Sequence, residues 1–195
     1  MNFLGHAALA EAGSDEQLLG SLIADGIKGS RALERLPLDV RQGVNHHRLV
    51  DATIDAHPYV QALVTRMPKR RFAAIGLDII WDYCLHRSVV MPADNWDALI
   101  QRSHNVIQAA EWLPPSKSTL LRHMVEGRWL ARSAEIDFVL DTLMHIGWHL
   151  RHPQDFSSLC EWIKAHLAML EHDFATIWQD MWQQTNIATG TCVSM

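Results

Sequence analysis

Apolar residues recur at helical spacing along most of this chain, and no segment alternates between apolar and polar residues as a half-buried strand would. Leu18, Leu19, Leu22 and Ile23 illustrate the pattern, because residues three and four positions apart lie on one face of a helix. The last ten residues, 186–195, show no such period. The sequence therefore predicts an all-α fold, with a single-domain helical bundle over residues 1–185 and a C-terminal tail over 186–195.

Proline and glycine mark the expected ends of these helices. A residue that precedes proline is displaced from the helical region, so helices should stop before Pro58 and Pro68, and Gly29 should end another. Residues 31–38 form the expected connector. The predicted helices cover residues 2–12, 15–28, 38–56, 58–67, 69–90, 95–111, 116–127, 133–150 and 155–183.

The composition narrows the classes of protein that this chain can represent. It has 195 residues, of which 48% are apolar, and this suits one domain with a packed core. The formal net charge of -5 argues against a nucleic-acid-binding protein, and no apolar run reaches the roughly 18–20 residues that span a bilayer. The first ten residues lack a basic start and indicate a first helix rather than a signal peptide.

The cysteines and tryptophans allow two further predictions. Three widely spaced cysteines match neither a disulfide framework nor a cysteine-rich zinc site, so a cytoplasmic location is the simplest interpretation. The tryptophans at helical spacing are expected to fill the core; they are Trp129, Trp148, Trp162, Trp178 and Trp182. The oligomeric state is not predicted.

One polar segment, residues 43–58, is the first candidate for chemistry. It places His47, Asp51 and Asp55 at successive four-residue steps, which stack on one helix face. An imidazole and two carboxylates on one face form half of a site for a divalent cation. A surface helix can carry the same spacing by accident.

The most apolar helix carries a second set of polar residues at the same spacing. Asp78, Asp82 and His86 follow one another at four-residue intervals. A carboxylate in such surroundings costs several kcal/mol to bury unpaired, so each needs a cation, an arginine, a helix cap or water. The alternative to a metal is an ion pair with Arg48, Arg70 or Arg71.

Two single residues complete the candidate set. Asp25 is the only acid in an apolar stretch at a predicted helix C-terminus, where the helix dipole disfavours negative charge. A metal would explain it, and so would an ion pair with Lys28 or Arg31. His6 lies on the apolar first helix and is either a ligand or a core residue. His145 and His149 are interpreted as structural, since no third ligand is evident nearby.

These segments together resemble the acyl-carrier-protein phosphodiesterase family. The matching stretches are NFLGH at 2–6, SLIADGIKG at 21–29, GVNHHRLVD at 43–51 followed by Asp55, and an Arg70-Arg71 pair followed by GLDIIWD at 76–82. A weaker match, RWL, stands at 128–130. The resemblance covers most of residues 2–87 closely and the remainder loosely.

The resemblance implies an all-helical fold distantly related to the HD-type metal-dependent phosphohydrolases. It also implies hydrolysis of the phosphodiester that joins 4'-phosphopantetheine to a serine of holo acyl carrier protein, with Mn²⁺ as the usual metal. A bound divalent ion polarises a phosphoryl oxygen and lowers the pKa of a bound water. We expect Asp25, His47, Asp51 and Asp82 as ligands, the first three being the catalytic set, with His6 and Asp78 as supporting or alternative ligands.

A basic rim is expected to contact the carrier protein, because carrier proteins are small, acidic and helical. Its candidate members are Lys28, Arg31, Arg48, Lys69, Arg70 and Arg71.

The sequence departs from the family pattern at Tyr83, where the family usually has histidine, and at Ala8, Gly5 and Gly26. His86 lies one turn further and is a possible replacement for the missing histidine. Two other functions stay open: a related phosphohydrolase with another phosphoester substrate, and a non-catalytic helical protein that binds an acidic partner.

Overall fold

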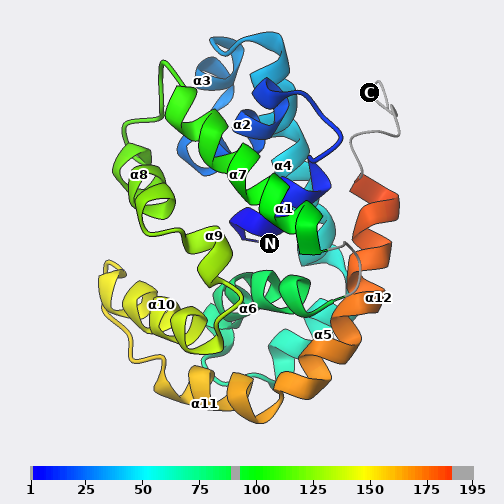
Figure 1. Cartoon of the computed structure of the whole chain (residues 1–195). Coiled ribbons are helices and arrows are strands. Elements are labelled where there is room, and N and C mark those ends of the chain that lie inside the picture. Colours follow the sequence, from blue (N-terminus) through cyan, green and yellow to red (C-terminus); the bar gives the residue numbers. More distant parts are fainter. Residues whose placement is uncertain (1, 89–92, 186–195) are drawn as a thin grey trace.

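The computed structural model describes residues 2–88 and 93–185, and every regular element in this part of the chain is a helix (Figure 1). The predicted all-α fold is therefore confirmed. The elements are α1 (Phe3–Leu9), α2 (Asp15–Ile23), the 3₁₀ turn η1 (Ala24–Gly26), α3 (Ser30–Glu34), α4 (Leu38–Ala56), α5 (Pro58–Arg66), the 3₁₀ turn η2 (Arg70–Phe72), α6 (Ala73–Arg87), α7 (Ala93–Ala109), α8 (Ser118–Glu126), α9 (Trp129–Arg132), α10 (Ile136–His149), α11 (Ser157–Ala165) and α12 (Leu167–Thr185).

Helix α6 lies at the centre of the molecule and contacts α1, α10, α11 and α12 (Figure 1). It is apolar on all sides, as expected of a helix that is surrounded by others. Leu77, Ile80, Trp81 and Leu85 are each at most 1% exposed. The short α1 packs between α6 and α2, which brings the first helix of the chain against its most buried one.

Helices α2 and α4 form the closest pair in the fold. A Cβ atom added to Gly20 would lie 2.1 Å from the carbonyl oxygen of Val40, and one added to Gly43 would lie 2.0 Å from that of Gln17. Only glycine permits this approach of two helix backbones. The approach brings the backbone of α2 within reach of side chains on α4, and this matters for His47.

Several predicted helix boundaries are wrong. The helix expected over 15–28 ends at Ile23 and continues as η1, and the connector over 31–38 contains α3. The helix expected over 155–183 is two helices that meet at His166, whose ring stacks on Trp162 and whose Nδ1 lies 2.8 Å from the Trp162 carbonyl oxygen. The helix expected from residue 69 begins as η2, because Lys69 is left-handed with φ of 52°. The short α9 was not expected.

The core prediction for the tryptophans holds for Trp178 and fails for Trp148. Trp178 is 5% exposed, whereas Trp148, on α10, is 52% exposed. Trp129, Trp162 and Trp182 are half-buried. The predicted tail, residues 186–195, lies outside the described residues. Within the described residues, no helix is long and apolar enough to span a membrane.

Candidate metal centre

Asp51 of α4 contacts the Nε2 atoms of two histidine rings. Its Oδ1 is 3.1 Å from Nε2 of His6, on α1, and its Oδ2 is 3.1 Å from Nε2 of His47, one turn earlier on α4. The two imidazoles stack with their centroids 3.7 Å apart and their planes 14° from parallel. Candidate ligand atoms of His6, His47 and Asp51 all lie within 4.8 Å of one another, as metal ligands do. We call these three residues the triad.

The orientation of His47 is fixed by the backbone of α2. Its Nδ1 lies 2.8 Å from the carbonyl oxygen of Ser21 and donates to it, because a carbonyl can only accept. Its Nε2 therefore faces Asp51 at 3.1 Å and Asp25 at 3.8 Å. If the His47 ring is neutral, the lone pair of Nε2 points at two carboxylates, which repel it. A proton or a metal cation must therefore lie between Nε2 and these carboxylates. A backbone carbonyl that holds the second ring nitrogen is typical of metal-binding histidines.

The two ring nitrogens of His6 are buried and, within the part of the chain that the structure describes, lack the hydrogen bonds that such atoms normally make. Its side chain is 3% exposed, and neither ring nitrogen makes a well-directed hydrogen bond with another described residue, although Nε2 is 3.1 Å from Asp51. Buried polar atoms are normally hydrogen-bonded or bound to an ion. The prediction that His6 is a satisfied core residue is therefore not favoured by its surroundings.

The pKa values of the triad are strongly coupled. Burial alone would lower the pKa of His47, but its hydrogen bonds to Asp25 and Asp51 outweigh burial and raise the pKa to about 9. Burial would raise the pKa of Asp51, yet the contacts with His47 and His6 lower it below its usual range. Burial lowers the pKa of His6 to about 3. Without a metal, the positive charge in the triad is thus the proton on His47, which a divalent cation can replace.

Asp25 extends the triad towards solvent and meets a lysine that the sequence did not indicate. Its pKa is lowered by the hydrogen bond with His47 and by the charge of Lys117, whose Nζ is 3.4 Å from its Oδ2. Lys117 belongs to the loop between α7 and α8, and its side chain packs on Gly26. Lys117 provides the cation that was expected from Lys28 or Arg31. The two charges are 92 positions apart in sequence, and no local pattern connects them.

Asp82 is used differently from the other acids. Its side chain is almost fully buried, and its two oxygens accept hydrogen bonds from the backbone N–H groups of Leu4 and Gly5, each at 3.0 Å. It therefore caps the N-terminus of α1, where free N–H groups and the helix dipole favour a carboxylate. The carboxyl is buried enough that its pKa rises to about 7. This geometry favours a role in positioning α1, and hence His6; direct ligation by Asp82 stays a prediction.

The remaining acids line a small cavity beside the triad. Its volume is about 230 Å³ and its walls come from η1, α4, α6 and Asn2. Asp78 is half-buried, and burial raises the pKa of its carboxyl. Asp55 is exposed at the same cavity. So many carboxylates around one hollow favour a cation over an anion there.

Comparison with known proteins shows the relationship of this chain directly. The family model described as "Acyl carrier protein phosphodiesterase" matches residues 1–181. The chain belongs to this family. Proteins named acyl carrier protein phosphodiesterase are 36% identical over 159 residues in Photorhabdus laumondii subsp. laumondii (79% of this chain, 78% of the relative) and 32% identical over 198 residues in Yersinia pestis (94% and 97%). A third, from Salmonella agona, is 32% identical over 183 residues (89% and 92%).

No solved structure matches the chain. The distant relationship of this phosphodiesterase family to HD-type phosphohydrolases stays a prediction.

The residues at which this member departs from the family pattern are also placed by the structure. Tyr83 is buried on α6. His86, the suggested replacement for a histidine at position 83, is not brought to the triad: its Nε2 lies 2.9 Å from the Leu130 carbonyl oxygen and 3.1 Å from the Ser133 hydroxyl. Gly26 contacts the loop that carries Lys117, since an added Cβ would lie 2.5 Å from the Pro114 side chain. A small residue at 26 thus allows Lys117 to approach Asp25.

The predicted basic rim is mostly exposed, as a protein-binding surface must be. Its members at 28, 31 and 69–71 are all exposed. Arg48 is exposed as well, but its Nη2 also donates to the Ile27 carbonyl oxygen at 3.0 Å and holds the segment after η1. A role for Arg48 in partner binding is therefore less favoured than a structural one. The contact of the other residues with a carrier protein stays a prediction.

Proposed function

We propose that this chain hydrolyses the phosphodiester between 4'-phosphopantetheine and the serine of holo acyl carrier protein, in the cytoplasm and with a divalent metal. Membership of the acyl carrier protein phosphodiesterase family makes it a phosphoric diester hydrolase with acyl carrier protein as its substrate. The observation that carries the metal-dependent part is the direction of His47, whose Nε2 faces Asp51 and Asp25 while Nδ1 is held by Ser21.

The residues present suit a borderline divalent ion. Two imidazoles and one carboxylate offer nitrogen and oxygen but no sulfur, a donor set that manganese, iron and zinc accept. Mn²⁺ is the metal that the family resemblance implies. The triad would hold the ion, with Asp25 as the nearest further carboxylate. Such an ion, when bound, polarises a phosphoryl oxygen and lowers the pKa of water.

The other residues of the site have roles that do not depend on which metal binds. Lys117 brings a positive charge to the outer side of Asp25, where it can pair with a phosphoryl oxygen of the substrate. Asp82 holds α1 so that His6 faces Asp51. The exposed basic residues at 28, 31 and 69–71 suit the acidic surface of a carrier protein and would raise the rate of encounter.

The direct test is incubation of the protein with holo acyl carrier protein and Mn²⁺, followed by intact-mass measurement of the carrier. We expect the carrier to lose the mass of phosphopantetheine. His47→Ala should abolish this loss, whereas His172→Ala, at an exposed position of α12, should not. An unchanged carrier mass at high enzyme concentration and saturating Mn²⁺ would refute the proposal.

Two further measurements would favour the alternatives. Hydrolysis of small phosphodiesters without any effect on the holo carrier would indicate a related phosphohydrolase with another substrate. Absence of bound metal after dialysis against Mn²⁺, together with binding of the carrier, would indicate a non-catalytic binding protein.

A further inference from the structure

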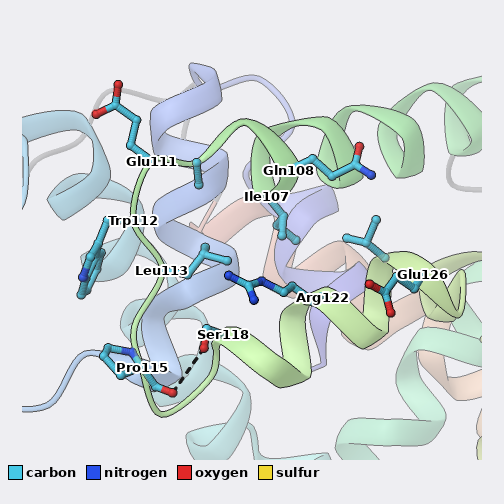
Figure 2. A pocket seen from close by; sticks show the side chains of 11 residues that line it. Ile107, Gln108, Glu111, Trp112, Leu113, Pro115, Ser118, Arg122 and Glu126 are labelled. Carbon is cyan, nitrogen blue, oxygen red and sulfur yellow. Dashed lines mark hydrogen bonds between the residues drawn. The ribbon is translucent and has the colours of Figure 1, made fainter.

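A second cavity is lined in part by the loop that carries Lys117. Its volume is about 520 Å³, and it is enclosed by the end of α7, the loop and α8 (Figure 2). This is within the range of roughly 300–1,000 Å³ that small-molecule sites occupy. The cavity is thus large enough for an organic group, unlike the 230 Å³ hollow beside the triad.

The lining of this cavity combines apolar walls with unused polar groups. Ile107, Leu113 and Val125 are buried or half-buried and provide the apolar surface. Gln108 and Arg122 provide an amide and a guanidinium, and neither side chain makes a hydrogen bond or ion pair with another described residue. Figure 2 shows the Arg122 side chain extending from α8 towards Leu113 of the loop. Two carboxylates, those of Glu111 and Glu126, also line the cavity. The lining therefore offers hydrogen-bond donors and acceptors beside apolar walls, as a ligand with both amide and methyl groups requires.

The cavity and the metal centre share one short segment of chain. Pro115 and Ser118 line the cavity, and Lys117, between them, is 3.4 Å from Asp25. Consecutive Cα atoms are about 3.8 Å apart, so only a few ångströms of loop separate the cavity rim from the residue that reaches the site. The cavity rim and the residue that contacts Asp25 are therefore neighbours in the chain, and this adjacency is the ground for assigning one ligand to both.

The expected substrate has a part that needs such a place. The arm attached to its phosphate is a linear, uncharged chain with two amide groups and a pair of methyl groups. It is comparable in length with about four residues of extended peptide, which span at most roughly 14 Å. The hollow beside the triad is too small for both a phosphate and this arm.

We propose that the cavity between α7, the loop and α8 binds the pantetheine arm of the substrate. This inference rests on the proposed function. Gln108, Ser118 and Arg122 hydrogen-bond the amides of the arm, and Ile107, Leu113 and Val125 contact its methyl and methylene groups. Lys117 pairs with the phosphate at the end of the cavity. Binding of the arm then makes the enzyme select this diester over others that offer the same phosphate chemistry.

Binding of the arm can be measured without turnover. Free pantetheine, which lacks the phosphate, is titrated into protein with labelled Ile, Leu and Val methyl groups and observed by NMR. We expect shifts at Ile107, Leu113 and Val125, and none at Leu19 and Val106, which line a different hollow between α2 and α7. Shifts confined to that other hollow, or none at millimolar pantetheine, would overturn the inference.

The kinetic test uses a variant whose new side chain fills the cavity. Gln108→Trp places a large ring at an exposed lining position of α7. Gln179→Trp makes the same change at an exposed position of α12 that lines neither this cavity nor the hollow beside the triad nor the one between α2 and α7. Values of kcat/KM are compared for holo carrier and for bis(4-nitrophenyl) phosphate. We expect Gln108→Trp to lower the ratio of kcat/KM for holo carrier to kcat/KM for bis(4-nitrophenyl) phosphate by on the order of tenfold. Gln179→Trp should leave this ratio unchanged.

Failure of the proposed function and failure of the cavity assignment give different results in these experiments. If wild-type protein hydrolyses neither compound with Mn²⁺, the proposed function is wrong, whatever the NMR titration shows. If it hydrolyses holo carrier and Gln108→Trp leaves the ratio unchanged, the function stands and the assignment of the cavity is wrong. Arg122→Ala is the second variant, since it removes a polar group without adding volume, and it should weaken pantetheine binding.

Discussion

Replacement of Asp82 by alanine tests whether Asp82 positions α1 or binds metal directly. The carboxylate of Asp82 accepts hydrogen bonds from Leu4 and Gly5, and it lies outside the group of candidate ligand atoms formed by the triad. Alanine would leave two buried N–H groups without an acceptor. The expected consequences are a loss of stability and a smaller, indirect loss of metal affinity.

The size of the stability loss follows from these two hydrogen bonds. A buried donor left without its partner costs about 1–3 kcal/mol, so two cost roughly 2–6 kcal/mol. Removal of a buried carboxylate recovers part of its own desolvation energy, which places the expected loss at about 2–3 kcal/mol. For a chain of this length, 1 kcal/mol corresponds to roughly 2–4 °C in Tm, so Asp82→Ala should lower Tm by about 4–12 °C.

The assay is thermal unfolding by circular dichroism, combined with titration of Mn²⁺. Asp55→Ala is the matched control, because Asp55 is an exposed acid at the same cavity; its Tm should change by no more than about 2 °C. Loss of a group that orients a metal ligand typically costs roughly 10–100-fold in metal affinity, and we expect this for Asp82→Ala. An Asp82→Ala variant with the Tm of the wild type and no metal binding would refute the reasoning and indicate that Asp82 is a ligand.

Four further predictions follow from the site and the fold. Asp25→Ala should abolish turnover while leaving the helical circular dichroism intact; unaltered activity would mean that the site is misplaced. Mn²⁺ at 100 times its Kd should stabilise the protein by about 2.7 kcal/mol, seen as a rise in Tm that EDTA reverses, because only the folded chain presents the triad. Gly43→Ala should lower the free energy of unfolding by about 1–3 kcal/mol in urea titrations, since the new Cβ would lie 2.0 Å from the Gln17 carbonyl oxygen. Burial lowers the pKa of His86, so below pH 6.5 the unfolded chain takes up a proton that the folded chain resists; Tm should fall as the pH falls, and less steeply in His86→Gln.

The sequence predicts those elements whose signals are local. Helix α4 has the expected bounds, Leu38–Ala56, because Pro37 directly precedes it and Pro58 begins the next helix. The four-residue spacing of His47 and Asp51 likewise places both on one face, and both belong to the triad. The predicted family is confirmed by the match over residues 1–181.

Features that depend on tertiary contacts could not be predicted in the same way. The break at His166 involves neither proline nor glycine, and at this position the His166 ring contacts the Trp162 carbonyl oxygen. Lys117 stands in no motif, and its partner Asp25 is 92 positions away. For Asp82 the sequence showed that a buried acid needs a partner, and a helix cap was among the possibilities. It could not show that the cap belongs to the first helix of the chain.

The bond between Asp82 and the start of α1 has a consequence for how the proposed metal centre would be assembled. The bond joins residues 78 positions apart, so His6 is held in place only after the chain has closed a loop of that size. Synthesis delivers His6 early, but the helix that carries it has no fixed position until α6 has been made and packed. For the proposed metal centre, we therefore expect uptake of the ion to be a late event in biogenesis that reports on completed long-range assembly rather than on local helix formation. A fragment that contains α1 to α4 holds every residue of the triad and should nevertheless bind metal poorly.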